Sequence, residues 1–370
     1  MFWQTCAREA VSLVEDINDI RARIERIDKQ ILELISKRTE AAKDIGRLKM
    51  TTSLPLRDLA IEDKVVSRYV QHAARLGIGE GTARQIASTL IKESVDAQSR
   101  MPRPSKPKDV LVVGGTGKMG SWICKYLRSR GHRVTVSDLV RSPDFPNAES
   151  LESAVPESDF VIIATPISAV GKSLEMVART SPDGIVFDIS SIKTPVTSVL
   201  KGAVKKGILA CSVHPMFGPE TESVFDRNII ICDCGSEKAS NDAEELMNWG
   251  GARMIRMPIE EHDRLMACVL GLSHAINIAF FDALTKTKID YMTLNQVAST
   301  TFRKQAATSR DVAFENPELY YDIQHLNPHN KRALDLLTDA VEEIKEAALS
   351  EDRRSLARIM ENGRKYFGGD

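Results

Sequence analysis

A proline-rich segment divides this chain into two parts of different character. Pro102, Pro104 and Pro107 lie within the short run that starts at Met101. Proline cannot continue a helix, and it pushes the residue before it towards extended geometry. We therefore predict a stiff, solvated linker over residues 101–107. Before this linker the pattern is helical throughout, and after it strands and helices alternate.

Length and composition set further limits. The chain has 370 residues, with 50 Lys and Arg against 51 Asp and Glu. Domains of roughly 100–200 residues predict two or three domains here, and the balanced charge argues against a nucleic-acid binder. We see no signal-peptide core and no apolar run near the roughly 18–20 residues of a membrane span. The cysteines are scattered, so we expect reduced thiols, no metal site and a cytoplasmic protein.

Residues 1–100 are expected to form an all-helical domain. The first helix should span about Ser12–Met50, because apolar residues recur at alternating spacings of three and four, as along a coiled-coil seam. These residues are Ile17, Ile20, Ile24, Ile27, Ile31 and Leu34. Arg38 then occupies a seam position where an apolar residue is expected. Two shorter helices, at about Leu59–Leu76 and Thr82–Ser99, cannot easily cover this seam, so a homodimer is expected.

Residues 108–257 are expected to form an α/β domain with a parallel sheet, because short β-branched runs alternate with helical stretches. The glycine-rich loop described below makes a dinucleotide-binding domain of the Rossmann type the expectation for this segment. The expected strands are Val110–Val113, Val134–Val136, Phe160–Ala164, Ile185–Asp188, Leu209–Val213 and Ile229–Ile231. Residues 258–370 return to an all-helical pattern. Its long helices are expected at His262–Thr285, Met292–Thr308 and Asn330–Leu349.

A glycine-rich loop follows the first expected strand and opens the next helix. It consists of Gly114, Gly115, Thr116, Gly117, Lys118, Met119 and Gly120. This G-x-G-x-x-G pattern allows a tight turn and brings a helix N-terminus close to a pyrophosphate. The next strand ends at Asp138, whose carboxylate would bind the adenosine ribose and repel a 2′-phosphate. We therefore predict an NAD site, although Arg141 nearby leaves NADP open.

Two further strands are followed by polar residues at their carboxyl ends, which face the ligand crevice in an open parallel sheet. Ser191 follows one strand and His214 follows the other. His214 is a candidate general base on a substrate hydroxyl whose carbon loses a hydride, and Ser191 is a candidate hydrogen-bond partner of that hydroxyl. A loop histidine capped by its neighbouring turn is the alternative. By pattern alone, His262 and His274 are interpreted as core histidines.

These runs resemble two known families. The glycine loop, Asp188–Lys193 and above all His214–Pro219 resemble prephenate dehydrogenase, as do Glu260–Asp263 and Phe302–Asp322. The N-terminal part is similar to the all-helical chorismate mutase. Its matching positions, in order and spacing, are Ile20–Ile24, Lys37–Arg38, Gly46–Lys49, Pro55–Asp58, Glu62 and Glu93–Gln98. Together they resemble the bifunctional chorismate mutase–prephenate dehydrogenase over nearly the whole chain.

The resemblance to chorismate mutase implies roles for individual residues. Arg38, Lys49 and Arg21, the last from a partner chain, would bind the carboxylates and ether oxygen of chorismate. The hydroxyl would contact Asp58 and Glu62. Ser94 and Gln98 would close the pocket, and Lys49, Glu62 and Gln98 would be the catalytic residues. Relatives commonly carry an arginine where this chain has Ile61, which leaves a weakened mutase open.

The resemblance to prephenate dehydrogenase implies a second set of roles. His214 and Ser191 would be catalytic, and the substrate would contact Arg310, with Arg303 as the second candidate, and also His274 and Glu220. Thr165 and Pro166 would contact NAD. The resemblance further implies that chorismate is converted to prephenate and then to 4-hydroxyphenylpyruvate in tyrosine biosynthesis. It also makes tyrosine a candidate feedback inhibitor.

Three alternative interpretations stay open at this point. In the first, the helical domain of a dehydrogenase serves only in dimerisation or tyrosine sensing. In the second, the dehydrogenase is specific for arogenate. In the third, the chain is a regulatory protein that binds NAD without catalysis, an interpretation that the intact set of His214, Ser191 and Arg310 argues against.

Overall fold

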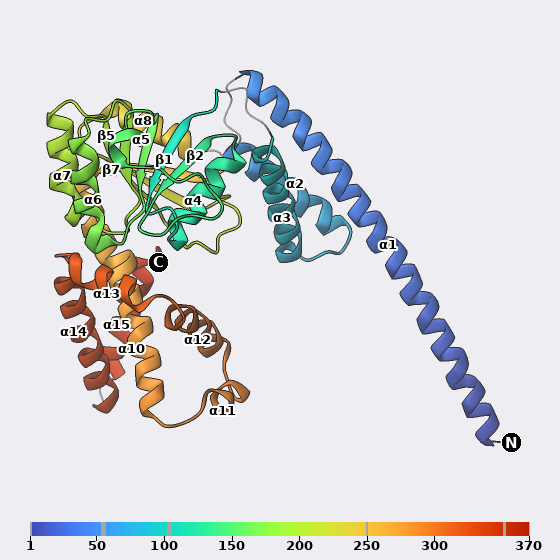
Figure 1. The fold of residues 1–370 in the computed structure, drawn as a ribbon. Helices are drawn as coiled ribbons and strands as arrows, with labels where there is room; N and C mark the ends of the chain where they lie inside the picture. Colours follow the sequence, from blue (N-terminus) through green and yellow to red (C-terminus); the bar gives the residue numbers. More distant parts are fainter. Residues whose placement is uncertain (1, 53–56, 102–105, 249–250, 351–352, 370) are drawn as a thin grey trace.

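The computed structural model describes residues 2–52, 57–101, 106–248, 251–350 and 353–369, and within the first helix the side chains of residues 17–49. The described chain forms an N-terminal helical region, a seven-stranded sheet with helices on both faces, and a C-terminal helical region (Figure 1). The predicted order of an all-α, an α/β and an all-α region is confirmed. The centre of the predicted linker, residues 102–105, lies outside the described residues.

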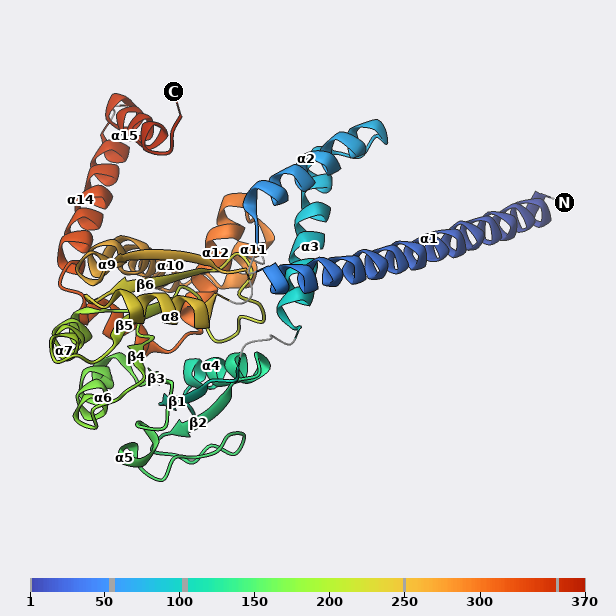
Figure 2. The ribbon, with the colours of Figure 1, turned by 90° about the horizontal axis from the view of Figure 1, so that it is seen from above.

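The N-terminal region contains α1 (Phe2–Thr52), α2 (Leu59–Arg75) and α3 (Glu80–Ser99). The first helix begins well before its predicted start at Ser12. It projects away from the rest of the chain (Figures 1 and 2), and its apolar seam is exposed, for example at Ile20 (59%) and Leu34 (63%). Near its C-terminal end α1 packs against α3, where a Cβ atom on Gly46 would lie 2.8 Å from Cγ of Gln98.

The sheet has the strand order β2-β1-β3-β4-β5-β6-β7. Its strands are β1 (Asp109–Val113), β2 (Arg133–Ser137), β3 (Phe160–Ile163), β4 (Ile185–Asp188), β5 (Ala210–Pro215), β6 (Asn228–Asp233) and β7 (Arg253–Pro258). The strands from β2 to β5 are parallel, but β6 runs antiparallel to β5. All six predicted strands are present. The prediction missed β7, because exposed residues such as Arg253 and Arg256 interrupt any apolar run.

Two apolar cores lie on opposite faces of this sheet, because alternate residues of each strand point to opposite sides. Val110 and Val112 of β1 belong to the core under α4 (Lys118–Ser129) and α8 (Glu237–Met247). Their neighbour Leu111 belongs to the core under α6 (Ile167–Arg179) and α7 (Thr194–Lys205). Because β1, β3 and β4 are parallel, their carboxyl ends lie together at one edge of the sheet. The short helix α5 (Leu151–Ala154) packs Leu151 and Ala154 against the second of these cores.

The C-terminal region contains seven α-helices and a π-helical turn among the described residues. The helices are α9 (Ile259–Met266), α10 (Ser273–Lys286), α11 (Tyr291–Gln296), α12 (Thr300–Ala313), α13 (Pro317–Leu326), α14 (Asn330–Leu349) and α15 (Arg353–Tyr366), and the π-helical turn Ala267–Leu272 joins α9 to α10. The prediction of one helix over Met292–Thr308 is wrong, because helix α11 ends at Gln296 and a new helix, α12, begins at Thr300. The hydroxyl of Ser299 accepts the N–H of Phe302 at 3.2 Å and so caps the new helix.

The stretch Ile259–Lys286 is long and apolar enough to cross a membrane by length and composition, with 22% of its most apolar window buried. The expectation that no apolar run reaches this length therefore does not hold by this criterion. The start of the stretch is nevertheless packed against protein, because His262 and Asp263 are buried and hydrogen-bonded to the sheet region.

Candidate active sites

The loop between β1 and α4 brings backbone against backbone. Gly114 has a φ of +88°, and a Cβ atom on Gly120 would lie 2.0 Å from the carbonyl oxygen of Gly114. Helix α4 begins after Gly117 without a side-chain cap, so its first N–H groups point into the loop without an intrahelical partner. A pyrophosphate fits this arrangement, because its oxygens can accept hydrogen bonds from these N–H groups and the glycines of the loop place no Cβ atom in its way.

Asp138 follows β2 at the edge of this loop. Its carboxylate accepts hydrogen bonds from the backbone N–H of Thr116 at 2.9 Å and from the Thr116 hydroxyl at 2.6 Å. Burial works to raise the pKa of Asp138, but the hydrogen bonds from Thr116 outweigh it and hold the pKa below its usual value. The carboxylate is therefore ionised beside the loop, as the predicted role on the ribose requires.

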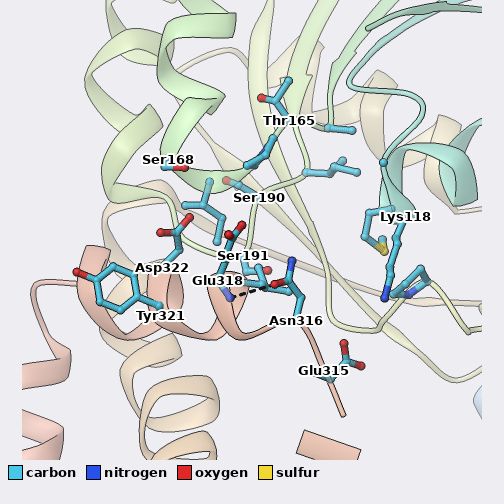
Figure 3. Close-up of a pocket in the computed structure, with 18 of the residues that line it drawn as sticks. Lys118, Thr165, Ser168, Ser190, Ser191, Glu315, Asn316, Glu318, Tyr321 and Asp322 are labelled. Carbon is cyan, nitrogen blue, oxygen red and sulfur yellow. Dashed lines mark hydrogen bonds between the residues drawn. The ribbon is translucent and has the colours of Figure 1, made fainter. Parts of the chain in front are cut away.

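A cavity of about 710 Å³ opens beside the glycine loop, and Figure 3 shows its lining. The strand side supplies the loop after β1, the loop after β3 with Thr165 and Pro166, and the loop after β4 with Ser191. The opposite wall is formed by the start of α13, including Asn316 and Tyr321. The structure thus brings together the predicted cofactor residues of the loop with Ser191 at the carboxyl ends of the strands.

His214 lies at the end of β5 and is hydrogen-bonded to a second histidine. Its Nδ1 is 2.9 Å from Nε2 of His262, whose Nδ1 is in turn 2.7 Å from Oδ1 of Asp263. All three residues are buried. The Asp263 carboxylate also accepts the N–H groups of Lys193 (2.8 Å) and Thr194 (2.7 Å) at the start of α7. These hydrogen bonds hold the imidazole of His214 through its Nδ1 atom.

Burial dominates the protonation of these three residues. It lowers the pKa of His214 well below 6.5, and the neighbouring His262 and Lys193 lower it further. Burial also lowers the pKa of His262, although Asp263 opposes the shift. For Asp263 burial works to raise the pKa, but hydrogen bonds from His262 and Thr194 lower it. Both imidazoles are therefore neutral and the carboxylate is ionised at neutral pH.

A buried ion pair supports the same strand ends. Lys193 has no exposed surface, and its Nζ contacts Oδ2 of Asp188 at 3.0 Å. The same ammonium donates to the carbonyl oxygens of Ser190 (2.7 Å) and Val213 (2.9 Å). Its three donors are thus satisfied, and the hydroxyl of Ser212 bonds the second oxygen of Asp188 at 2.5 Å. This network joins the ends of β4 and β5, which carry Ser191 and His214.

The predicted substrate residues lie farther apart. Arg303 and Arg310 are exposed on α12, which is unbroken between them, and neither lines the cavity. Their side of the helix is set by Ser309, which donates to Asn277 on α10 at 2.8 Å. Glu220 is also exposed. None of Arg303, Arg310, Glu220 and His214 is among the residues that line the cavity, so the cavity does not bring them together with Ser191.

His274 occupies a different position on α10. Its ring stacks on Tyr320 of α13, with 4.3 Å between the ring centres. Its Nδ1 is buried and has no hydrogen-bond partner in the described part of the chain, and burial lowers its pKa. A neutral imidazole with a free nitrogen fits the predicted contact with a substrate better than it fits a packing role.

In the N-terminal region, Arg38 reaches from α1 to α3. One of its Nη atoms donates to the carbonyl oxygen of Leu90 at 2.7 Å and to the Ser94 hydroxyl at 2.6 Å. One turn farther along α3, Nε2 of Gln98 donates to the carbonyl oxygen of Ala42 at 2.8 Å. Oε1 of Gln98 is buried without a partner among the described residues. The predicted residues Arg38, Ser94 and Gln98 therefore lie together where α1 packs against α3.

The start of α2 places two charged groups close to Lys49 near the end of α1. Burial lowers the pKa of Lys49, while the charges of Asp58 and Glu62 oppose that shift, so the three groups are near one another. Asp58 caps α2 by accepting the N–H of Ile61 at 3.2 Å. Arg21 does not join them: it lies 17 residues before Arg38 on the same helix, or roughly 25 Å away at 1.5 Å per residue.

The sequence pattern alone missed three contributors to these sites. His262 was interpreted as a core histidine, which is correct for its burial but leaves out its bond to His214. By residue type alone Asp263 and Arg57 carry no signal, since a carboxylate or guanidinium in a helical run is usually solvated. Both lie in runs that resemble the two families, Glu260–Asp263 and Pro55–Asp58, but the resemblance implies no role for either residue.

Comparison with known proteins agrees with these regions one by one. The family model for chorismate mutase type II matches residues 20–99. The models for the nucleotide-binding domain and the dimerization domain of prephenate dehydrogenase match residues 124–256 and 258–362. The match to the nucleotide-binding domain begins at residue 124, after the glycine loop, so the loop is identified by its geometry.

Individual relatives cover different shares of the chain. A T-protein from Haemophilus influenzae is 25% identical over 367 residues, which covers 97% of this chain and 94% of the relative. A probable arogenate/prephenate dehydrogenase from Methanocaldococcus jannaschii is 29% identical over 70% of this chain, which spans 61% of that relative. The crystal structure of A. aeolicus prephenate dehydrogenase with hydroxyphenyl propionate and NAD+ superposes with a TM-score of 0.58 at 19% identity, covering 71% of this chain and 98% of that one, and shows the shared fold.

The glycine loop yields a first prediction. In Gly120→Ala the added methyl would overlap the carbonyl oxygen of Gly114, so the loop must shift. Overpacking of this kind costs about 1–3 kcal/mol; if that cost falls on the NAD-bound loop, the loss of NAD affinity is about five- to 150-fold. Equilibrium titration with NAD measures it. Gly202→Ala, on α7 with nothing within 4 Å of the added atom, is the control and should bind NAD normally; equal affinities in the two variants would contradict this role of the loop.

Proposed function

Because this chain belongs to the family in which a type II chorismate mutase is joined to a prephenate dehydrogenase, we propose that it catalyses two successive steps of tyrosine biosynthesis. It rearranges chorismate to prephenate, then oxidises and decarboxylates prephenate to 4-hydroxyphenylpyruvate with NAD. The observation that carries this proposal is that two separate polar sites lie in the two matched enzymatic regions. We assign the domains to residues 1–100, 108–257 and 258–370, with a linker at 101–107, and a cytoplasmic location.

The mutase reaction is unimolecular, so the enzyme has only to hold the folded conformer of chorismate and stabilise charge on its ether oxygen. We assign this task to Arg38 and Lys49, with Glu62 and Gln98 as hydrogen-bonding groups. The bonds from Arg38 to Leu90 and Ser94 support the assignment, because they orient the guanidinium before a substrate arrives. We assign Asp58 to the substrate hydroxyl.

In the dehydrogenase, His214 is the proposed general base. The ionised Asp263 requires the proton of His262 on Nδ1, which leaves Nε2 of His262 as an acceptor for the Nδ1–H of His214. Nε2 of His214 is then unprotonated and takes the proton from the substrate hydroxyl. NAD would supply the acceptor for the hydride of the same carbon. Loss of carbon dioxide from the resulting ring ketone leaves its electron pair in the ring, which becomes aromatic, and the former carbonyl oxygen takes up a proton, which His214 can return.

Two further assignments are part of this proposal. We keep Arg310 and Arg303 as candidates for the carboxylates of prephenate, together with His274, Glu220 and Ser191 as other substrate contacts. Tyrosine carries the same ring as the product and is the candidate feedback inhibitor. Both assignments depend on the family resemblance more than on the cavity itself.

The proposed function is tested with chorismate as the only substrate in the presence of NAD. The wild type should consume chorismate and then form NADH. The Arg38→Ala variant should no longer consume chorismate but should still oxidise added prephenate, because Arg38 lies in the N-terminal helical region. His214→Asn should keep chorismate loss but lower kcat for prephenate oxidation about 10²–10⁴-fold, as expected for loss of a general base.

Each alternative interpretation has its own outcome in this assay. A wild type that oxidises prephenate but leaves chorismate unchanged would make the helical domain a dimerisation or regulatory module. Faster turnover of arogenate than of prephenate would identify an arogenate dehydrogenase. NAD binding without any turnover would identify a regulatory protein.

The pairing of His214 with His262 yields a third prediction. Because burial keeps the pKa of His214 well below 6.5, wild-type kcat for prephenate should stay constant as the pH falls through 6.5. His262→Leu removes the acceptor for Nδ1–H and should lower kcat roughly tenfold, with both KM values little changed. His262→Gln keeps an acceptor oxygen and should recover part of the loss. A His262→Leu enzyme with the wild-type kcat and pH profile would remove His262 from the mechanism.

We also propose a homodimer in which each α1 covers the exposed seam of the other. This arrangement would bring Arg21 of one chain to the proposed mutase site of the other. Ile27, 46% exposed on that seam, gives the test. Ile27→Glu should lower mutase activity at least tenfold and decrease the sedimentation coefficient or broaden its distribution, since a buried charge without a partner is costly. Leu32→Glu, at a 67% exposed position beside the seam, is the matched control. Equal mutase rates in the two variants would argue against this interface.

A further inference from the structure

One arginine joins the proposed mutase site to the sheet region. Arg57 precedes Asp58 at the start of α2, and its guanidinium grips Glu62 with two parallel hydrogen bonds, Nε to Oε1 and Nη2 to Oε2, both 2.8 Å. The side chains of Arg57 and Glu62 are only 13% and 16% exposed. This two-point contact fixes the plane of the carboxylate as well as its position.

The other edge of the same guanidinium faces the dehydrogenase. Its Nη1 lies 2.7 Å from Oδ1 of Asp226, in the loop before β6, and 3.4 Å from the carbonyl oxygen of Gly251. The ring of Phe225 lies under the guanidinium, with 4.6 Å between Cζ and the ring centre. Arg57 is therefore held by groups of the sheet region on one side while it holds Glu62 on the other.

The loops that contact Arg57 are themselves tightly placed. A Cβ atom on Gly251 would lie 2.8 Å from Val95 of α3 and 3.2 Å from Phe225, so the two regions pack here without space to spare. The backbone N–H of Asp226 bonds the carbonyl oxygen of Gly251 at 3.1 Å. Beside them the hydroxyl of Ser223 donates to Asp96 of α3. The position of Asp226 relative to α2 is thus fixed by several contacts.

We propose that the dehydrogenase domain helps to build the chorismate mutase site, with Asp226 acting through Arg57 as a positioning residue for Glu62. This inference rests on the proposed role of Glu62. Chorismate is a dianion, so a second function follows: Arg57 offsets the negative charge of Glu62 as the substrate approaches. Without the Asp226 carboxylate, the guanidinium keeps only the Gly251 carbonyl and the Phe225 ring on its dehydrogenase side, so Arg57 is held less firmly and Glu62 is oriented less precisely.

The decisive experiment is a double-mutant cycle on the full-length protein. Asp226 has a φ of +60°, a conformation that asparagine also tolerates, so Asp226→Asn removes the charge without straining the loop. It should lower mutase kcat about five- to tenfold with little change in KM for chorismate, while prephenate oxidation keeps its wild-type kinetics. In an Arg57→Ala background the same substitution should have no further effect, because Asp226 acts only through Arg57.

The matched control is Asp109→Asn. Asp109 pairs with Arg133 on the sheet and its side chain is 43% exposed, against 44% for Asp226. This variant should leave both activities unchanged. Wild-type mutase kinetics in Asp226→Asn, or effects of Arg57→Ala and Asp226→Asn that simply add, would overturn the inference.

A third variant separates this inference from the proposed function. Glu62→Gln should lose mutase activity. If it does, while Asp226→Asn is like the wild type, the site assignment stands and the coupling to the dehydrogenase is refuted. If Glu62→Gln turns over normally, the assignment of Glu62 itself is refuted, and the inference falls with it.

Discussion

The carboxylate of Asp263 holds three parts of the dehydrogenase in one arrangement. It is on α9 of the C-terminal region, yet it accepts N–H groups at the start of α7 and the imidazole of His262. A carboxylate at a helix N-terminus is favoured by the free N–H groups and by the helix dipole. The backbone oxygen of Asp263 also receives Asn327 from the segment before α14. Asp263 therefore docks the C-terminal helices onto the sheet and, through His262, orients His214, the proposed base.

This arrangement has a direction with pH. The pKa of His214 and that of His262 are lowered from 6.5 by burial, so below that pH the unfolded chain takes up protons that the folded chain excludes. The pKa of Asp263 is lowered below 3.8 in the folded chain, so the stability that its ionised carboxylate contributes is lost as the pH falls through this lowered pKa. Both effects reduce stability in acid. The groups that make His214 a neutral base thus also make the domain junction sensitive to acid.

The sequence predicted what depends on local pattern. The strands from β1 to β6 are mostly buried and, apart from β5, rich in β-branched residues. The glycine loop is a backbone constraint that only glycine meets, so both could be recognised. The antiparallel direction of β6 and the strand β7 depend on pairing between distant segments, and Arg253 and Arg256 hide the latter. The roles of His262 and Arg57 depend on contacts 48 and 194 residues away, to His214 and Gly251. No local pattern contains such contacts.

Exposed apolar surface is the remaining feature of the two helical regions. On α1 it is a narrow seam, and on Ile259–Lys286 it is a broad stretch of which 22% of the most apolar window is buried. A bilayer cannot account for the second stretch as it stands, since its first turns carry Asp263 and His262 in bonds to the sheet. This stretch lies within the match to the dimerization domain of prephenate dehydrogenase, which is in keeping with the homodimer proposed above. If a second copy covers both surfaces, the two helical regions serve one assembly, in which α1 completes the mutase site and α10 encloses the dehydrogenase site beside His274.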